Sequence, residues 1–424
     1  MALDSALPLS PVARGRCNSW SFVPLNKNHA MMDRMRAVLT PNYSPQPLHI
    51  ERGEGCYVFD AEGQRYLDMM GGIATAVLGH CHPAVRTALV KQADKLWHIS
   101  NLLITSPQVE LAERLTELCF ADLVFFGNSG AEANEAALKL ARRYAHDRGE
   151  NRFEIIAFEG AFHGRTLFTL GATGTPAYWK GFGPLPEGIF HVPFGDLEAT
   201  RARLSERTAA IIVEPVQGES GVRPAPPGFL EGLRELATEN GCLLIFDEVQ
   251  AGMGRTGPLF AHQSGAAEPD IMTLAKALGN GIPIGAMLTR SEIGASLVPG
   301  THASTFGGNP LAAACACAVL DTLVRGGVLA QAAKTAKHFD RALAELAESL
   351  GKSRVVETRG SGHLRAIELT TPAAGVIERC RESGVLVIAA GERNLRLAPP
   401  LIISEDEIDT GLAAVESAIR AEIA

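Results

Sequence analysis

Six short apolar segments between residues 122 and 288 constrain the fold of this chain most strongly. Each is five to seven residues long and lacks the strict apolar–polar alternation of a half-exposed strand. Amphipathic stretches such as AEANEAALKLARRYAHDRG separate them. The segments are DLVFF at 122–126, EIIAF at 154–158, AIIVEP at 210–215, CLLIFDE at 242–248, DIMTL at 270–274 and IGAML at 284–288. This pattern predicts an α/β fold, with strands buried on both faces of a mainly parallel sheet.

The two ends of the chain predict a second, smaller domain. GCYVFDAEGQRYLDMMGG (55–72) alternates around DAEG and indicates a β-hairpin. Near the C-terminus, apolar residues three or four positions apart mark one face of a helix. They are Ile408, Leu412, Val415 and Ile419.

We therefore divide the chain into three parts. A large domain is expected at 75–310, and a small α+β domain at 41–74 together with 311–424. Residues 1–40 form an N-terminal extension, for which a disordered arm and an organelle-targeting segment are the alternatives.

Composition excludes several classes of protein. A net charge of −8 and a pI near 5.9 argue against nucleic-acid binding, which needs a basic face. No apolar run approaches the roughly 18 residues of a membrane span. The eight cysteines are scattered without a C-x-x-C pair, which indicates reduced thiols in a cytoplasmic protein. GHCHP at 79–83 has no second ligand cluster, so we expect no metal site.

Polar residues follow the ends of the predicted strands. In an open parallel sheet, ligands bind beyond the carboxyl ends of the strands. Ser129 and Gly130 follow VFFGN and open a helix, whose first N–H groups would bind a phosphate. The alternative is that Ser129 only caps that helix. Glu214, Asp247 and Lys276 end or follow three other segments.

Lys276 lies in IMTLAKALGNGIPIGA, an apolar and glycine-rich stretch. It is either a surface lysine or a nucleophile whose charge is suppressed by burial. A phosphate cradle, an aspartate and a lysine on one sheet edge suit pyridoxal 5'-phosphate. Its aldehyde needs a lysine amine, and its ring nitrogen needs an anion.

GMGRTG at 252–257 matches a dinucleotide-binding motif, but a proline follows it and no acidic partner is evident, so we expect no dinucleotide site there.

Taken together and in order, these motifs resemble the class III, fold type I aminotransferases that use pyridoxal phosphate. The resemblance runs from about residue 45 to the C-terminus, and within the family it is greatest to acetylornithine aminotransferases. It depends on motifs such as LGHCHP, NSGAEANEAALKLAR, AFHGRT, VEPVQGESG, IFDEVQAGMGRTG, LAKALGNGIPIGA, STFGGNPLA and LRLAPPL. It implies a large domain around a mainly parallel sheet, a small α+β domain, and a homodimer with shared active sites.

The resemblance also implies roles for single residues. Lys276 and Asp247 would be catalytic, Lys276 as the amine that binds the cofactor and Asp247 as the partner of the pyridine nitrogen. The remaining cofactor-binding residues would be Ser129, Gly130, Ala131, Phe162, Glu248, Val249, Gln250 and Thr305, the last from the neighbouring subunit. The substrate-binding residues would be Arg165, Glu219, Ser304 and Arg396.

The implied reaction has two halves in one pocket. Arg165 would hold the α-carboxylate of an acylated amino acid, N-acetylornithine, whose ω-amine is passed to 2-oxoglutarate. Glu219 would neutralise Arg396 for that donor and release it for the γ-carboxylate of glutamate. Ornithine, succinylornithine, succinyl-diaminopimelate and 4-aminobutyrate are the rival donors. An aminomutase, a racemase and a non-catalytic pyridoxal-binding protein are the alternatives from other classes.

Some residues depart from the family pattern. Ala131 stands where many acetylornithine enzymes have Thr, which removes a hydroxyl but keeps the backbone N–H. GNG follows the lysine in place of GGG, and RGSGHLRAIEL (359–369) is a loose version of a family motif.

Overall fold

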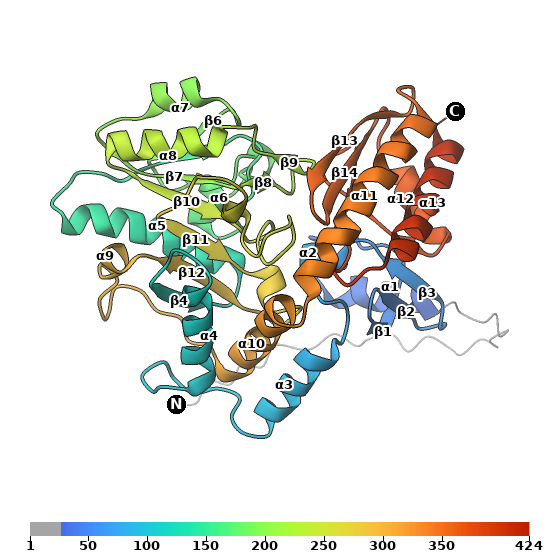
Figure 1. Ribbon diagram of the computed structural model, residues 1–424, viewed down its shortest axis with the longest axis horizontal. Helices are drawn as coiled ribbons and strands as arrows, with labels where there is room; N and C mark the ends of the chain where they lie inside the picture. Colours follow the sequence, from blue (N-terminus) through green and yellow to red (C-terminus); the bar gives the residue numbers. More distant parts are fainter. Residues whose placement is uncertain (1–26, 424) are drawn as a thin grey trace, which may run out of the picture.

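The computed structural model describes residues 27–423 and places two lobes side by side (Figure 1). The prediction for residues 1–26 lies outside the described part of the chain. The larger lobe contains a seven-stranded sheet, and the smaller lobe contains two four-stranded sheets.

The large sheet has the order β4-β12-β11-β10-β7-β5-β6. Neighbouring strands of this sheet run parallel to each other, except that β12 runs antiparallel to both β11 and β4. Its strands are β4 (Leu123–Gly127), β5 (Glu154–Phe158), β6 (Ile189–Val192), β7 (Thr208–Val213), β10 (Leu243–Asp247), β11 (Ile271–Leu274) and β12 (Gly285–Thr289). The mainly parallel sheet predicted from the six apolar segments is therefore confirmed, with β6 as an additional edge strand.

Alternate residues of the central strands pack on opposite faces of this sheet. Ile155 and Ala157 of β5 join the cluster that contains α5, whereas Ile156 and Phe158 join the cluster that contains α8. Both sets are fully buried, which explains why the apolar segments show no alternation.

Helices cover both faces and the lower end of the large lobe in Figure 1. α10 packs against α3 and α4 in a third cluster with β11 and β12. The helices of this lobe are α3 (Pro83–Ala93), α4 (Ser106–Glu117), α5 (Gly130–Asp147), α6 (Leu167–Ala172), α7 (Leu197–Arg203), α8 (Phe229–Asn240), α9 (Ser291–Gly294) and α10 (Pro310–Val324). The short α2 (Gly71–Ala74) lies between the lobes, and its Ala74 packs against residues of both. Three short 3₁₀ turns, η1 (Pro176–Tyr178), η2 (Ala261–Ser264) and η3 (Lys276–Leu278), lie in its loops.

The small lobe combines the beginning and the end of the described chain. The predicted hairpin is present as β2 (Tyr57–Asp60) and β3 (Arg65–Asp68), flanked by β1 (Ile50–Glu54) and the parallel β15 (Val385–Leu386). The second sheet has the order β13-β14-β17-β16. Its strands are β13 (Val355–Ser361), β14 (Leu364–Leu369), β17 (Asn394–Leu397) and β16 (Ile388–Ala389).

Helices α11 (Val328–Leu350), α12 (Ala374–Glu382) and α13 (Glu405–Glu422) complete the small lobe. α13 buries the predicted face, including Ile408 and Ile419, and a Ser404–Glu407 capping box begins it. Residues 27–38 of the predicted extension form helix α1 (Lys27–Val38). The domain boundaries themselves stay a prediction.

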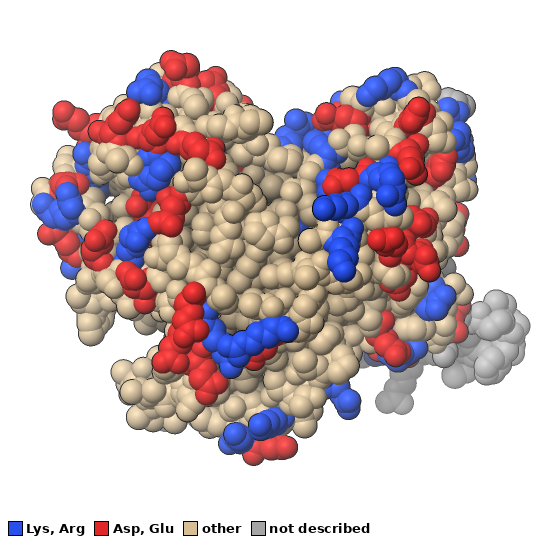
Figure 2. All heavy atoms as spheres, viewed as in Figure 1, with Lys and Arg blue, Asp and Glu red and all other residues tan. Residues whose placement is uncertain are grey.

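Two further observations concern the described residues as a whole. No single helix among them is long and apolar enough to cross a membrane. Helices α10 and α11 meet at a bend of 62°, and only when taken together are they long and apolar enough for a membrane span. Both helices contribute residues to buried clusters of the protein. On the face shown in Figure 2, basic and acidic side chains are interspersed around a broad uncharged middle.

Candidate active site

The predicted site residues converge on a cavity of about 360 Å³ at the carboxyl end of the large sheet. Of the residues predicted from the sequence, those that line it are Ser129, Gly130, Ala131, Phe162, Arg165, Asp247, Val249, Gln250 and Lys276. They come from loops and helix starts that follow β4, β5, β10 and β11. This is the sheet edge at which ligands of open α/β sheets bind.

Lys276 begins η3, two residues after β11 ends. Its backbone is left-handed, with φ of 38°, so the chain turns sharply and presents the side chain to the cavity. Burial lowers the pKa of Lys276, an effect opposed by the nearby Glu219 carboxylate. Within the described residues no carboxylate forms an ion pair with its amine. Burial thus favours the neutral form of this lysine, which is the nucleophilic form.

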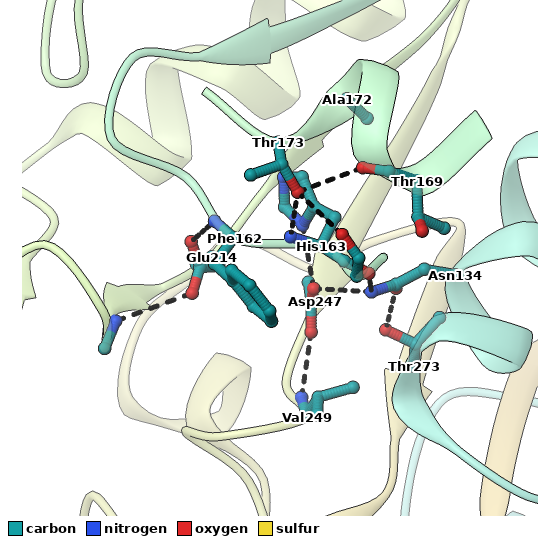
Figure 3. Close-up of polar contacts among 12 residues, drawn as sticks. Asn134, Phe162, His163, Thr169, Ala172, Thr173, Glu214, Asp247, Val249 and Thr273 are labelled. Atoms are coloured by element: carbon teal, nitrogen blue, oxygen red, sulfur yellow. Dashed lines mark hydrogen bonds and ion pairs between the residues drawn. The ribbon is translucent and has the colours of Figure 1, made fainter. Parts of the chain in front are cut away.

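Asp247 ends β10 and is held by two side chains (Figure 3). Asn134 Nδ2 and His163 Nδ1 each donate to Asp247 Oδ2 at 2.7 Å, and the Val249 N–H donates to Oδ1 at 3.0 Å. Thr273 in turn donates to Asn134 Oδ1 at 2.7 Å. Asp247 is 3% exposed and beside the cavity, so it offers a fixed, buried acceptor to a ligand there.

The N-terminus of α5 forms a phosphate-sized cradle. Ser129 caps the helix, its hydroxyl accepting the Glu132 N–H at 3.2 Å, so the capping alternative is also realised. Within the described chain, the N–H groups of Gly130 and Ala131 have no hydrogen-bond acceptor. A side chain at Gly130 would meet Val249 Cγ1 at 2.7 Å, which explains the glycine. Free N–H groups at the start of a long helix bind anions.

Glu214, at the end of β7, connects two loops of the site. Its Oε2 accepts the Phe162 N–H at 2.9 Å, which fixes the aromatic ring beside Asp247 (Figure 3). Burial and the nearby Asp247 raise the pKa of Glu214 well above its usual value. Arg165 lies at the rim, exposed, with its guanidinium 3.6 Å from the Tyr178 ring centroid. A cation stacked on an aromatic ring at a cavity rim is suited to hold a carboxylate.

Glu219 and Arg396 form the predicted pair just outside the cavity. Arg396 Nη1 is 2.6 Å from Glu219 Oε1 and also donates to Gln250 Oε1 at 3.1 Å. Gln250 Nε2 donates to Glu219 at 3.3 Å. Burial raises the pKa of Glu219, but the charges of Arg396 and Lys276 outweigh burial and hold this pKa below its usual value. Glu219 is therefore ionised at neutral pH.

Besides Glu219 and Arg396, three more predicted residues do not line the cavity. The Glu248 carboxylate points away from it and accepts the N–H and Nδ1 of His262, at 2.8 and 2.9 Å. Ser304 contacts Asn128 of its own chain, whose Nδ2 donates to Ser304 Oγ at 3.2 Å. Thr305 is exposed on the surface.

Comparison with known proteins agrees with this geometry. The family description "Aminotransferase class-III" matches residues 38–419. The chain belongs to the class III aminotransferase family. An acetylornithine aminotransferase of Myxococcus xanthus is 51% identical over 381 residues, which cover 90% of this chain and 95% of that protein.

Other relatives of this aminotransferase carry broader names. An acetylornithine/succinyldiaminopimelate aminotransferase of Photorhabdus laumondii is 46% identical, covering 93% of this chain and 99% of that protein. Among solved structures, an N-acetylornithine aminotransferase of Stenotrophomonas maltophilia has a TM-score of 0.79 at 37% identity, with coverage of 92% and 98%. The ornithine aminotransferase of Toxoplasma gondii has a TM-score of 0.90 at 32% identity, with coverage of 94% and 96%.

The residues present fit pyridoxal phosphate, the cofactor of this family of aminotransferases. The free N–H groups of Gly130 and Ala131 would hold the phosphate, and Phe162 and Val249 would enclose the ring. Asp247 would hold the proton of the ring nitrogen, and Lys276 would bind the aldehyde carbon. When bound, the cofactor supplies an aldehyde that takes up the amino group and a ring that withdraws electrons from the reacting carbon.

Two residues that position Asp247 were not predicted from the sequence. Neither His163, which follows Phe162 in AFHGRT, nor Asn134 of α5 is among the site residues expected from the sequence. Asn134 is a polar residue on the buried face of α5, among Ala133, Ala136 and Ala137. A buried polar side chain on an otherwise apolar helix face was the available signal, because such a group requires a hydrogen-bonding partner.

Proposed function

We propose that this aminotransferase transfers the ω-amino group of N-acetylornithine to 2-oxoglutarate. The observation that carries the proposal is the ion pair of Glu219 with the buried Arg396 beside the cavity. With the pair closed, Arg396 is neutralised and the reacting end of a donor needs no carboxylate. With Glu219 withdrawn, Arg396 can bind a carboxylate through charged hydrogen bonds, each contributing about 1.5–3 kcal/mol.

The position of Arg396 orients both substrates. The donor reacts at the carbon farthest from its α-carboxylate, so that carboxylate reaches outward to Arg165 at the rim. Glutamate reacts at its α-carbon, so its α-carboxylate lies beside the reacting atoms. Arg396 donates a hydrogen bond to Gln250, and Gln250 and Lys276 both line the cavity. This favours the α-carboxylate of glutamate on Arg396 and its γ-carboxylate on Arg165, the reverse of the assignment expected from the sequence.

The chain's own residues then carry out the proton transfer. Lys276, with its lowered pKa, would take the proton from the amino-bearing carbon of the donor and deliver it to the cofactor within the same half-reaction, and in the second half-reaction it would move a proton the opposite way, onto the α-carbon of glutamate. Asp247 keeps the ring-nitrogen side of the site negative, held in place by His163 and Asn134. Phe162 and Val249 exclude water from the faces of the ring.

The names of the relatives support the choice of donor. The Myxococcus xanthus relative is named for acetylornithine, and the more distant Toxoplasma gondii structure is named for ornithine. Succinylornithine and succinyl-diaminopimelate share the neutral acylated nitrogen and are the nearest rivals, followed by ornithine and 4-aminobutyrate.

A panel of amino donors tests this proposal. Each donor is supplied with 2-oxoglutarate and the formation of glutamate is followed. We expect kcat/KM for N-acetylornithine to be at least about tenfold above that for ornithine or 4-aminobutyrate, a gap of about 1.4 kcal/mol. If ornithine or 4-aminobutyrate is the better donor, the proposed donor is wrong.

We also propose that the working enzyme is a homodimer with shared sites. Thr305 is exposed next to Phe306, which is 58% exposed and whose ring centroid lies 4.9 Å from that of His98. Leu102 and Ile104, 92% and 89% exposed, lie in the loop of Asn101, whose Nδ2 donates to the Ser304 carbonyl at 3.0 Å. Large exposed apolar patches mark protein interfaces, and a second copy placed here would receive Thr305.

Hybrid dimers test the shared site. A Lys276→Ala subunit and a Thr305→Ala subunit are each expected to be inactive or strongly impaired as homodimers. After subunit exchange, a mixed dimer would contain one intact site and recover activity. Demonstrated exchange without any recovery would contradict the shared site.

A further inference from the structure

The loop that carries Glu219 is the tip of a small hairpin, which we call the gate hairpin, Val216–Pro224. It consists of β8 (Val216–Gln217), β9 (Arg223–Pro224) and the turn between them. The turn is tightly constrained: Gly221 has φ of 98°, and Val222, fully buried, has φ of 52°. A β-branched residue in this region is strained, and such a turn persists only when its surroundings hold it.

Two arginines of the small lobe hold the turn from the same row of one sheet. Arg359 of β13 pairs with Ala366 of β14, and Ala366 pairs with Arg396 of β17. Directly paired residues of antiparallel strands project to the same face, so both arginines flank a small alanine. Arg396 Nη1 donates to the carbonyl of Gly218 at 3.0 Å, and Arg359 Nε donates to the carbonyl of Gly221 at 2.7 Å.

The two arginines differ in their charge partners. Arg359 is bound by Glu368 at 2.7 Å, by Glu357 and by the Asn394 side chain, all of them in the small lobe. Its charge is therefore neutralised without the gate hairpin. Arg396 has Glu219 as its carboxylate partner, and its Nε has no hydrogen-bond partner in the described structure.

The contact between Arg359 and the turn is close. A side chain at Gly221 would lie 2.6 Å from Arg359 Nη2 and 2.9 Å from Asn394 Nδ2. The glycine thus allows the turn to sit directly on the guanidinium. Arg359 is the first residue of RGSGHLRAIEL, the segment identified from the sequence as a loose version of a family motif.

We propose that Arg359 is a positioning residue that anchors the backbone of the gate hairpin, so that Glu219 opens and closes by rotation of its side chain alone. The inference rests on the proposed function of the Glu219–Arg396 pair. Because the backbone is fixed at Gly218 and Gly221, Glu219 returns to Arg396 each time the carboxylate substrate leaves. Without the anchor, Arg396 would spend part of the time without its carboxylate partner and would disfavour the neutral donor, whereas a dicarboxylate would still bind.

The test compares Arg359→Met with Arg393→Met in the holoenzyme. Arg393 also binds Glu368, at 3.3 Å, but within the described residues it forms no hydrogen bond or ion pair with the gate hairpin, and its side chain is half exposed, which makes it a matched control. We expect Arg359→Met to raise KM for N-acetylornithine at least about fivefold and KM for 2-oxoglutarate by less than about twofold. The control should change neither. Arg359→Lys, which keeps the charge near Glu368 but loses the planar donor pair, replaces Arg359→Met if that variant does not fold.

Hydrogen–deuterium exchange of the peptide 216–224 provides the second measurement. Amides of the turn should exchange faster in the Arg359 variant than in the wild-type protein or the control, whichever donor the enzyme uses. If the wild-type enzyme does not use N-acetylornithine, the proposed donor is refuted, but the comparison of exchange rates between the variants still tests the role of Arg359. Unchanged exchange, or equal rises of both KM values, would overturn the role of Arg359.

Discussion

Replacing Glu219 by Gln tests the gate most sharply, because it keeps the shape of the side chain and removes its charge. The Arg396–Glu219 contact is 2.6 Å long, and the Arg396 side chain is 1% exposed while that of Glu219 is 27% exposed. Glu219→Gln leaves a buried guanidinium without its carboxylate when the donor is bound.

The magnitude follows from the kind of bond that is lost. Breaking a fully buried ion pair costs about 3–5 kcal/mol, but Glu219 is partly solvated and Gln still offers an acceptor. We therefore take the value for a charged hydrogen bond, about 1.5–3 kcal/mol, which corresponds to roughly 10- to 150-fold in rate. We expect kcat/KM for N-acetylornithine to fall within that range and kcat/KM for glutamate to change less than about threefold.

Stopped-flow measurement of each half-reaction, with a single substrate, separates the two effects through the absorbance of the cofactor. Glu268→Gln serves as a control, because Glu268 pairs with Arg290 and does not line the cavity. An equal loss in both half-reactions would refute the gate, since it would show that Glu219 supports the site in general.

Three further predictions follow from the site and the core. Asp247→Asn should lower kcat by orders of magnitude while cofactor stays bound, because the anion opposite the ring nitrogen is lost; normal kcat in the remaining holoenzyme would contradict this. Gly130→Ala should weaken cofactor binding about tenfold or more, because its methyl group would displace Val249, and titration of the folded apoenzyme measures this. Burial, with the charges of Arg255 and Arg365, lowers the pKa of His363 from 6.5 to about 3. The folded state thus binds fewer protons between these values, so stability is lost as pH falls below about 6.5, by up to about 1.4 kcal/mol per pH unit. His363→Gln should flatten the thermal stability between pH 7 and 5, and an unchanged slope would show that His363 is not the titrating group.

The central sheet could be predicted because its strands are buried on both faces. β6 was missed because Ile189–Val192 is an edge strand of mixed, half-exposed residues. The reversed direction of β12 was also not predicted, since a doubly buried strand reads the same in either direction.

The site was predictable where residues end or closely follow neighbouring strands, as Asp247 does after β10 and Lys276 after β11. It was not predictable where the direction of a side chain decides, because neighbouring residues of a loop can face opposite ways. Asp247 faces the cavity, whereas Glu248 turns to His262. Adjacent positions in the sequence carry no information on this choice.

Contacts between the two lobes could also not be predicted from the sequence. The GMGRTG loop binds the β13–β14 turn, where the His363 N–H donates to the Arg255 carbonyl at 2.9 Å and Ser361 donates to the Thr256 carbonyl at 2.8 Å. A motif that looks like a dinucleotide site is thus part of the joint between lobes. More than 100 residues separate the two partners, and no local pattern links them.

The identity of the lysine that binds the cofactor tests the account most directly. Borohydride reduction of the holoenzyme fixes the cofactor on its lysine, and peptide mass spectrometry then locates it. The left-handed position of Lys276 in the cavity lining, together with Asp247 and the α5 N-terminus, predicts a pyridoxyl group on Lys276 and loss of the visible cofactor absorbance in Lys276→Ala. A pyridoxyl group on any other lysine, with Lys276 unmodified, would contradict the account.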